Sequence, residues 1–134
     1  MMQCVTSWMC TASTVLSDGW LVDSGASVHI SGSADKLEHA VAVKVPVRAF
    51  GGTIHYATLV GDVTFLFYSM DNVPVRFVLR GVLYVENAPR FILSESILRQ
   101  AGCVLHLETG KSFFSVPRKV GALWHSVHCR SYLY

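Results

Sequence analysis

The chain has 134 residues, which is enough for one domain with a hydrophobic core and too few for two domains of ordinary size. Hydrophobic residues make up 51% of the chain and charged residues 15%, a composition that excludes an intrinsically disordered protein. The formal net charge is +2, and Lys and Arg are scattered without a basic run, so we expect no nucleic-acid partner.

The cysteines and the apolar stretches indicate where the protein works. The four cysteines form neither a C-x-x-C pair nor a dense secreted framework, which is typical of thiols in a reducing compartment. Charged residues interrupt the apolar stretches before they reach the roughly 18 residues that a membrane span needs. Residues 1–16 lack the positive segment of a signal peptide. We therefore predict a soluble intracellular protein of the cytoplasm or nucleus, not secreted and without a membrane partner.

Apolar alternation predicts most of the secondary structure after an N-terminal segment, residues 1–19, that carries no clear pattern. The period of two is clearest in residues 41–47 and 73–79, which we predict as half-buried strands. Shorter β-rich segments bounded by Gly, Pro, Asn or Asp cover residues 20–22, 54–60, 63–68, 82–85, 91–93, 103–107 and 113–116. Many short strands at close spacing predict a sandwich or a barrel.

One segment, from about Glu95 to Gln100, has the pattern of a short helix. Ser94 can cap its first turn, and Gly102 can end it. The remaining residues, 117–134, are ambiguous, and we assign them to a C-terminal tail. The predicted organisation is thus a single domain over residues 20–116 between two peripheral segments.

Asp23 stands at the end of an apolar strand, in the segment Trp-Leu-Val-Asp-Ser-Gly-Ala-Ser of residues 20–27. A carboxylate that leaves a buried strand can be held in a low-dielectric site. Ser24 offers it a hydroxyl, and Gly25 allows the backbone to turn tightly around it. An Asp-Ser-Gly tripeptide is by itself usually an ordinary turn. The flanking residues must therefore decide whether Asp23 is catalytic.

These flanks resemble retroviral-type aspartic proteases, and most of all the protease, or β-barrel, domain of copia-type retrotransposon Pol polyproteins. Residues 20–31 are similar nearly throughout to the catalytic strand, turn and following His of that family. Gly51 and Gly52, followed by Thr53, lie between two alternating strands, as in a flap hairpin. Residues 82–107 are similar to the strand, short helix and Ala-Gly strand that follow in copia-type chains. The resemblance covers residues 20–116.

The resemblance implies an all-β fold: a closed, mostly antiparallel, retropepsin-like β-barrel with one short helix near residues 95–100. It implies that Asp23 is the catalytic carboxylate, that Ser24, Gly25 and Ala26 support the active site, and that Gly51, Gly52 and Thr53 form the flap over a polypeptide substrate. Family chemistry needs two aspartates, and this chain has one such motif, so a homodimer is implied. The two Asp23 carboxyls would share one proton, and neither a metal nor another cofactor is required.

Three alternatives differ from this interpretation. The first is a catalytically inactive β-barrel or dimerisation remnant of such a polyprotein, suggested by a chain that begins at Met1 without a preceding zinc-knuckle array or a following integrase. The second is a zinc site at His125, His128 and Cys129, which is disfavoured because no second ligand pair has the required spacing. The third, a serine hydrolase, is disfavoured because Ser24 lies in no G-x-S-x-G elbow.

Overall fold

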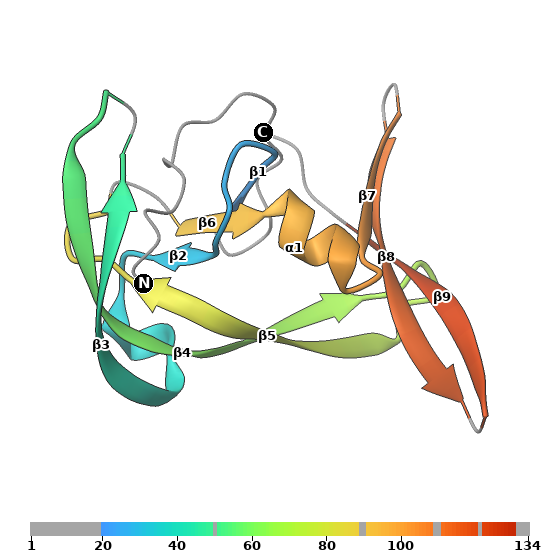
Figure 1. Ribbon diagram of the computed structural model, residues 1–134. Helices are drawn as coiled ribbons and strands as arrows, with labels where there is room; N and C mark the ends of the chain where they lie inside the picture. Colours follow the sequence, from blue (N-terminus) through green and yellow to red (C-terminus); the bar gives the residue numbers. More distant parts are fainter. Residues whose placement is uncertain (1–19, 50, 89–90, 109–110, 121, 131–134) are drawn as a thin grey trace.

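The computed structural model describes residues 20–49, 51–88, 91–108, 111–120 and 122–130. These residues form a six-stranded sheet, a three-stranded sheet, one short α-helix and one 3-10 turn (Figure 1). The predicted predominance of strands is therefore confirmed. Within these ranges, no helix has both the length and the apolar character that crossing a bilayer requires.

The elements agree with the predicted segments in most places. They are, in chain order, β1 (Trp20–Asp23), β2 (Ile30–Ser31), η1 (Ala34–Lys36), β3 (Glu38–Arg48), β4 (Ile54–Tyr68), β5 (Pro74–Tyr84), β6 (Phe91–Ser94), α1 (Glu95–Gln100), β7 (Val104–Glu108), β8 (Lys111–Val120) and β9 (Leu123–Arg130). The short elements β2 and η1 were not predicted, because two or three residues are too few to show a period. Strand β9 lies inside the predicted tail.

Strands β4 and β5 each join two segments that the sequence had separated. In β4 the join is at Gly61, beside a register shift between Gly61 and Val63. A Cβ atom at Gly61 would lie 2.9 Å from the carbonyl oxygen of Glu38 on β3, so only glycine allows this close approach without a shift of the neighbouring backbone. The turn signal at Gly61 thus marks an irregularity inside one strand and not a strand end.

The larger sheet has the strand order β1-β6-β2-β5-β4-β3. Its β1–β6 and β2–β5 pairs are parallel, and its β2–β6, β3–β4 and β4–β5 pairs are antiparallel. In the part of the chain that the structure describes, β1 and β3 are the two ends of this order, so the sheet is open. The predicted closed and mostly antiparallel barrel is not confirmed. Hairpins are local and have turn signals, whereas the β1–β6 pair joins residues far apart in the sequence and has none.

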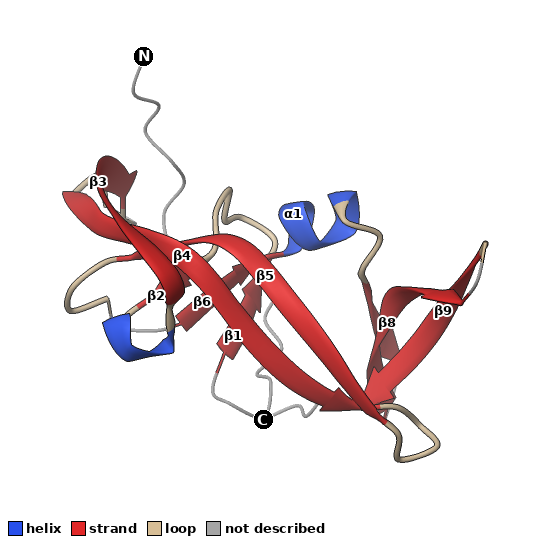
Figure 2. Ribbon diagram, turned by 90° about the horizontal axis from the view of Figure 1, so that it is seen from below, coloured by secondary structure: helices blue, strands red, loops and turns tan. Residues whose placement is uncertain are grey.

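Strands β1 and β6 lie across the long pair of β4 and β5, whereas β2 pairs with the last residues of β5. Figure 2 shows β4 and β5 as a long twisted pair, and Figure 1 places the three short strands above it. The smaller sheet, in the order β7-β8-β9, is antiparallel and lies to one side, beyond α1. This arrangement brings the end of β1, where Asp23 lies, next to the start of α1.

Two hydrophobic clusters form the core. The first surrounds Trp20, whose ring is 5.1 Å from the rings of both Phe65 and Phe91, edge-on to the former and tilted to the latter. The second contains Ala26, Ile30, Val47, Ala57, Leu83, Val85 and Ile92. Strand β1 contributes to the first cluster, and the turn that follows Asp23 ends in the second. The candidate site is therefore anchored in core on both sides.

Candidate active site

Asp23 is the last residue of β1, and its partner in the parallel pair is Ser94, the last residue of β6. Both residues are 0% exposed. The chain then turns back at once: the Gly25 amide donates a 2.7 Å hydrogen bond to Asp23 Oδ1, and the Ala26 amide donates a 3.4 Å bond to the Asp23 carbonyl oxygen. Ser24 and Gly25 are exposed, whereas Ala26 is buried. The predicted tight turn after a buried strand is confirmed.

The carboxyl group of Asp23 is in an environment that disfavours its charge. Oδ2 is buried and has no hydrogen-bond partner within the described residues. Burial raises the pKa of Asp23 above its ordinary value of 3.8, and the bond from the Gly25 amide opposes this rise only in part. A carboxyl group of this kind holds a proton at a higher pH than an ordinary aspartate, as a general acid must.

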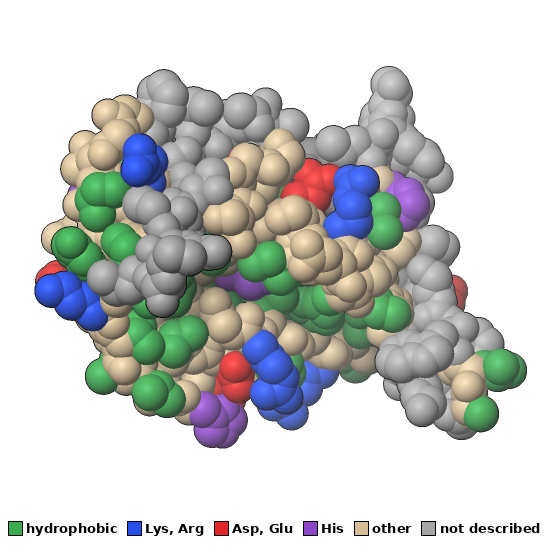
Figure 3. Space-filling view, in the orientation of Figure 1, with side chains coloured by type: hydrophobic (Ala, Val, Ile, Leu, Met, Phe, Trp, Pro, Cys, Tyr) green, Lys and Arg blue, Asp and Glu red, His purple; other side chains and the backbone are tan. Residues whose placement is uncertain are grey.

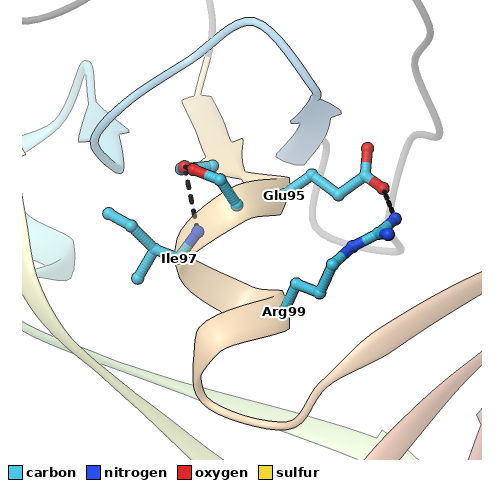
Figure 4. Close-up of polar contacts among 5 residues, drawn as sticks. Glu95, Ile97 and Arg99 are labelled. Atoms are coloured by element: carbon cyan, nitrogen blue, oxygen red, sulfur yellow. Dashed lines mark hydrogen bonds and ion pairs between the residues drawn. The ribbon is translucent and has the colours of Figure 1, made fainter.

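Ser94 connects the Asp23 turn to α1. Its hydroxyl donates a 2.7 Å hydrogen bond to the Ala26 carbonyl oxygen and accepts a 3.3 Å bond from the Ile97 amide. Figure 4 shows the bond from Ile97 at the start of the helix, beside the Glu95–Arg99 ion pair. The predicted cap at Ser94 is confirmed. Its bond to Ala26 was not predicted, because the two residues are far apart in the sequence.

His29 holds Ser94 from the other side. The Ser94 amide donates a 2.9 Å hydrogen bond to Nδ1 of His29, which is 1% exposed. Since Nδ1 accepts, the proton of the neutral ring is on Nε2. Burial lowers the pKa of His29 from 6.5 to about 4. The sequence singled out His29 only as part of the resemblance over residues 20–31 and did not predict its bond to Ser94. Its position six residues after Asp23 was the one hint of a role at the site.

The predicted flap residues form the turn between β3 and β4. Gly51 and Gly52 have φ values of 91° and 89°, as expected for adjacent hairpin glycines. The Ala49 amide bonds the Thr53 carbonyl oxygen at 2.8 Å. This tip is exposed, whereas Val47 and Ala57, in the strand pairs next to the turn, pack in the same cluster as Ala26. The hairpin and the Asp23 turn are thus joined just behind the hairpin tip, and a flap role for the tip stays a prediction.

Replacing Gly52 with Ala is expected to lower the free energy of unfolding by about 1 kcal/mol. A Cβ atom at Gly52 would meet nothing within 4 Å, so the cost is that of the positive φ alone. Urea denaturation measures the change. Gly52→Asn is the matched control, because Asn tolerates positive φ better, and it should cost less. Equal losses for Ala and Asn would contradict a backbone origin.

Ser94→Ala is expected to lower the free energy of unfolding by about 2 kcal/mol, because it removes a helix cap and leaves the buried Ala26 carbonyl oxygen without its donor. Ser96→Ala is the control: Ser96 is exposed, and its hydroxyl contacts the Ser94 hydroxyl at 3.1 Å. Urea denaturation of both variants should show the larger loss at position 94. A smaller loss of stability at position 94 than at position 96 would show that the Ser94 hydroxyl does not stabilise the turn and the helix.

The described side chains include no group of three His, Cys, Asp or Glu residues that could hold a metal ion. The side chains of His125, His128 and Cys129, which the sequence raised as zinc ligands, lie outside the part that the structure describes.

The fold and the site define a strand-rich domain with one buried aspartate in a tight turn at a strand end. A comparison with protein families matches residues 20–103 to the Pol polyprotein beta-barrel domain, over more than half of the chain. The chain therefore belongs to this family of Pol polyprotein domains. The match includes Asp23, both hairpin glycines and Ser94. No curated protein and no solved structure matches the chain.

Proposed function

We propose that this chain is the aspartic endopeptidase domain of a copia-type retrotransposon Pol polyprotein, and that it cleaves polypeptides as a homodimer with one Asp23 from each chain. One observation carries the proposal: Asp23 lies in an Asp-Ser-Gly-Ala turn at the end of a buried strand, with a raised pKa and with one carboxyl oxygen that has no partner among the described residues. Membership of the Pol polyprotein family supports it. So does the order in which three segments of residues 20–116 resemble retropepsin-like proteases.

The unpartnered oxygen supports a second carboxyl group at the site. A buried oxygen atom without a hydrogen bond costs free energy, and the described part of one chain offers Oδ2 no donor. In a twofold dimer, the Asp23 of the partner would supply that donor by sharing a proton between the two carboxyl groups. Two adjacent carboxyl groups cannot both ionise at low cost, so the pair would titrate as a unit.

The chemistry then needs only these two carboxyl groups and a water molecule. The ionised Asp23 accepts a proton from the water, which attacks the peptide carbonyl carbon, while the protonated Asp23 donates to the carbonyl oxygen. The Asp23 that took the water proton then donates a proton to the peptide nitrogen as the C–N bond breaks. The other Asp23 takes a proton back from a hydroxyl of the tetrahedral intermediate, so that the pair again holds one proton. Gly25 holds one Asp23 oxygen through its amide, so the carboxyl group has a fixed direction. Closure of the hairpin tip at Gly51, Gly52 and Thr53 over the peptide would exclude bulk water.

A second candidate function is that of a catalytically inactive domain in a Pol polyprotein, retained for its fold or for dimerisation. One observation favours it. Asp23 is 0% exposed in the single chain, so neither water nor a peptide reaches its carboxyl group without rearrangement. In the enzyme, dimer formation would have to open this site. In the inactive domain, no such opening takes place.

A cleavage assay separates the two candidates. The purified chain is incubated at mildly acidic pH with a mixed peptide library, with and without pepstatin, and sedimentation gives its oligomeric state. Pepstatin-sensitive cleavage by a dimer is the expected result. A folded dimer that cleaves nothing would identify the inactive domain, and a chain that stays monomeric at high concentration would count against the enzyme.

A further inference from the structure

The turn after Asp23 is held at both ends by one residue of β6. At its start, Asp23 pairs with Ser94 across the parallel β1–β6 strands. At its end, the Ala26 carbonyl oxygen accepts the 2.7 Å hydrogen bond from the Ser94 hydroxyl. Between these points the Gly25 amide holds the carboxyl group itself. A displacement of Ser94 would therefore move both ends of the turn, and with them the direction of the carboxyl group.

Ser94 is in turn held from two directions. Its hydroxyl caps α1 by accepting from the Ile97 amide, and its own amide donates to Nδ1 of His29. The backbone of His29 is held in place, because the His29 carbonyl oxygen accepts a 3.0 Å hydrogen bond from the Leu83 amide on β5. A series of short hydrogen bonds between buried groups thus connects β5, through His29 and Ser94, to the Asp23 turn.

We propose that His29 and Ser94 are positioning residues, which fix the Asp23 turn for catalysis by the bond from the Ser94 amide to His29 Nδ1 and the bond from the Ser94 hydroxyl to the Ala26 carbonyl oxygen. The role in catalysis rests on the proposed endopeptidase function. The mechanical role, holding the turn, does not depend on it. Neither residue contacts the substrate in this proposal, and both act through Asp23.

The chemistry of His29 fits this role. A buried imidazole that accepts from a backbone amide must be neutral at the accepting nitrogen, and the burial of His29 keeps the ring neutral at ordinary pH. The accepting Nδ1 is two bonds from Cβ, which is also the position of the side-chain oxygen of asparagine. The oxygen of glutamine is one bond farther from Cβ. Asn at position 29 therefore offers an acceptor where Nδ1 of His29 lies, and Gln offers one that is displaced from it.

The test compares three variants at position 29: Asn, which keeps the acceptor in place, Gln, which displaces it, and Leu, which removes it. Amide hydrogen exchange is measured on the folded chain at the Ser94 and Ala26 amides. We expect exchange at Ser94 about tenfold faster in the Leu and Gln variants and near the wild-type rate in the Asn variant. The Phe65 and Val78 amides, which belong to the β4–β5 pair, are the internal control and should not change.

Cleavage kinetics then test the role in catalysis. Leu and Gln at position 29 are expected to lower kcat about tenfold or more with little change in KM, and Asn is expected to restore most of it. If exchange and kcat are the same in the Asn and Leu variants, His29 only fills space and the proposal is wrong. If the wild-type chain cleaves nothing, the proposed endopeptidase function is wrong. The exchange rates still show whether His29 and Ser94 hold the Asp23 turn. If His29→Leu does not fold, the Gln and Asn pair gives the same comparison.

Discussion

Asp23→Asn is expected to lower the rate of peptide cleavage by about 10⁴-fold, the upper end of what general acid–base catalysis by a positioned side chain contributes. The variant keeps the shape of the side chain and removes the group that exchanges a proton with the water and the peptide. Kinetics with one cleavable peptide from the library measure the loss. Cleavage by the variant at more than about a hundredth of the wild-type rate would show that Asp23 is not the catalytic acid or base.

The same variant carries its own control for folding. Because burial raises the pKa of Asp23, the folded chain binds the proton of this carboxyl group more tightly than the unfolded chain does. The contribution of Asp23 to stability is thus fully present below the ordinary pKa of 3.8 and is lost as the pH rises through the folded-state pKa. Asp23→Asn should therefore unfold at higher urea concentration than the wild type at pH 7, and this advantage should shrink as the pH falls through the folded-state pKa and be gone below the ordinary pKa of 3.8. A variant that is less stable at pH 7 would contradict the buried position.

Mixing the variant with the wild type tests the requirement for two chains. If each active site needs Asp23 from both chains, mixed dimers are inactive. Equal amounts, once exchanged, should then retain about a quarter of the activity of an all-wild-type sample, because only that share of dimers has two Asp23 residues. Retention of about three quarters would indicate that one Asp23 per dimer is sufficient for cleavage, because the mixed dimers, half of the total, would then be fully active.

His29 is expected to make the domain sensitive to acid, with a loss of about 3 kcal/mol in the free energy of unfolding between pH 6.5 and pH 4. Its pKa falls from 6.5 to about 4 on folding, so its contribution is fully present above 6.5 and is lost as the pH falls through about 4. Protonation also removes the acceptor for the Ser94 amide. Urea denaturation at several pH values measures the loss.

His29→Asn is the matched control, because it keeps an acceptor for Ser94 and does not titrate. Other acidic groups contribute to acid unfolding in both proteins, so the difference between wild type and variant isolates His29. The wild type should lose more stability than the variant over this range. Parallel stability curves from pH 7 to pH 4 would show that His29 is not buried as a neutral ring.

These two groups set opposite limits on the pH at which the proposed enzyme works. The Asp23 pair needs a pH low enough to keep one shared proton, and the His29–Ser94 bond needs a pH above about 4. We therefore expect cleavage to be highest at mildly acidic pH and to fall below about pH 4 as the Asp23 turn loosens. His29→Asn should extend activity to lower pH, because Asn keeps the bond to Ser94 in acid.

Many of the exposed large hydrophobic residues of the described chain gather on one pair of strands. Figure 3 shows few charged side chains on the face it presents, with hydrophobic side chains between them. Exposed large hydrophobic residues lie mainly on β4, on β5 and in their turn: Ile54, Tyr56, Leu66, Tyr68, Met70, Val73 and Val78. If the domain cleaves peptides as proposed, the peptide library measures its specificity directly.

The sequence by itself determined the local structure of this protein. Alternation in residues 41–47 predicted β3, and the pattern of Ser94, Glu95 and Gly102 predicted α1, because periodicity and capping depend on residues close in the chain. Adjacent glycines predicted the positive φ values at the tip of the β3–β4 hairpin. An apolar strand followed by small residues predicted that Asp23 is buried at the start of a tight turn.

Only the tertiary structure decided what surrounds that turn. The parallel pairing of β1 with β6 places Ser94 opposite Asp23, and no local signal in either segment specifies the partner. The parallel β1–β6 and β2–β5 pairs make the sheet mixed, and among the described strands it is open between β1 and β3, where a closed and mostly antiparallel barrel was expected. His29 and Ser94 meet across 65 residues of sequence, so their bond has no period or motif that a sequence could show. Strand identity depends on neighbouring residues, whereas the site depends on contacts that form only when distant strands pair.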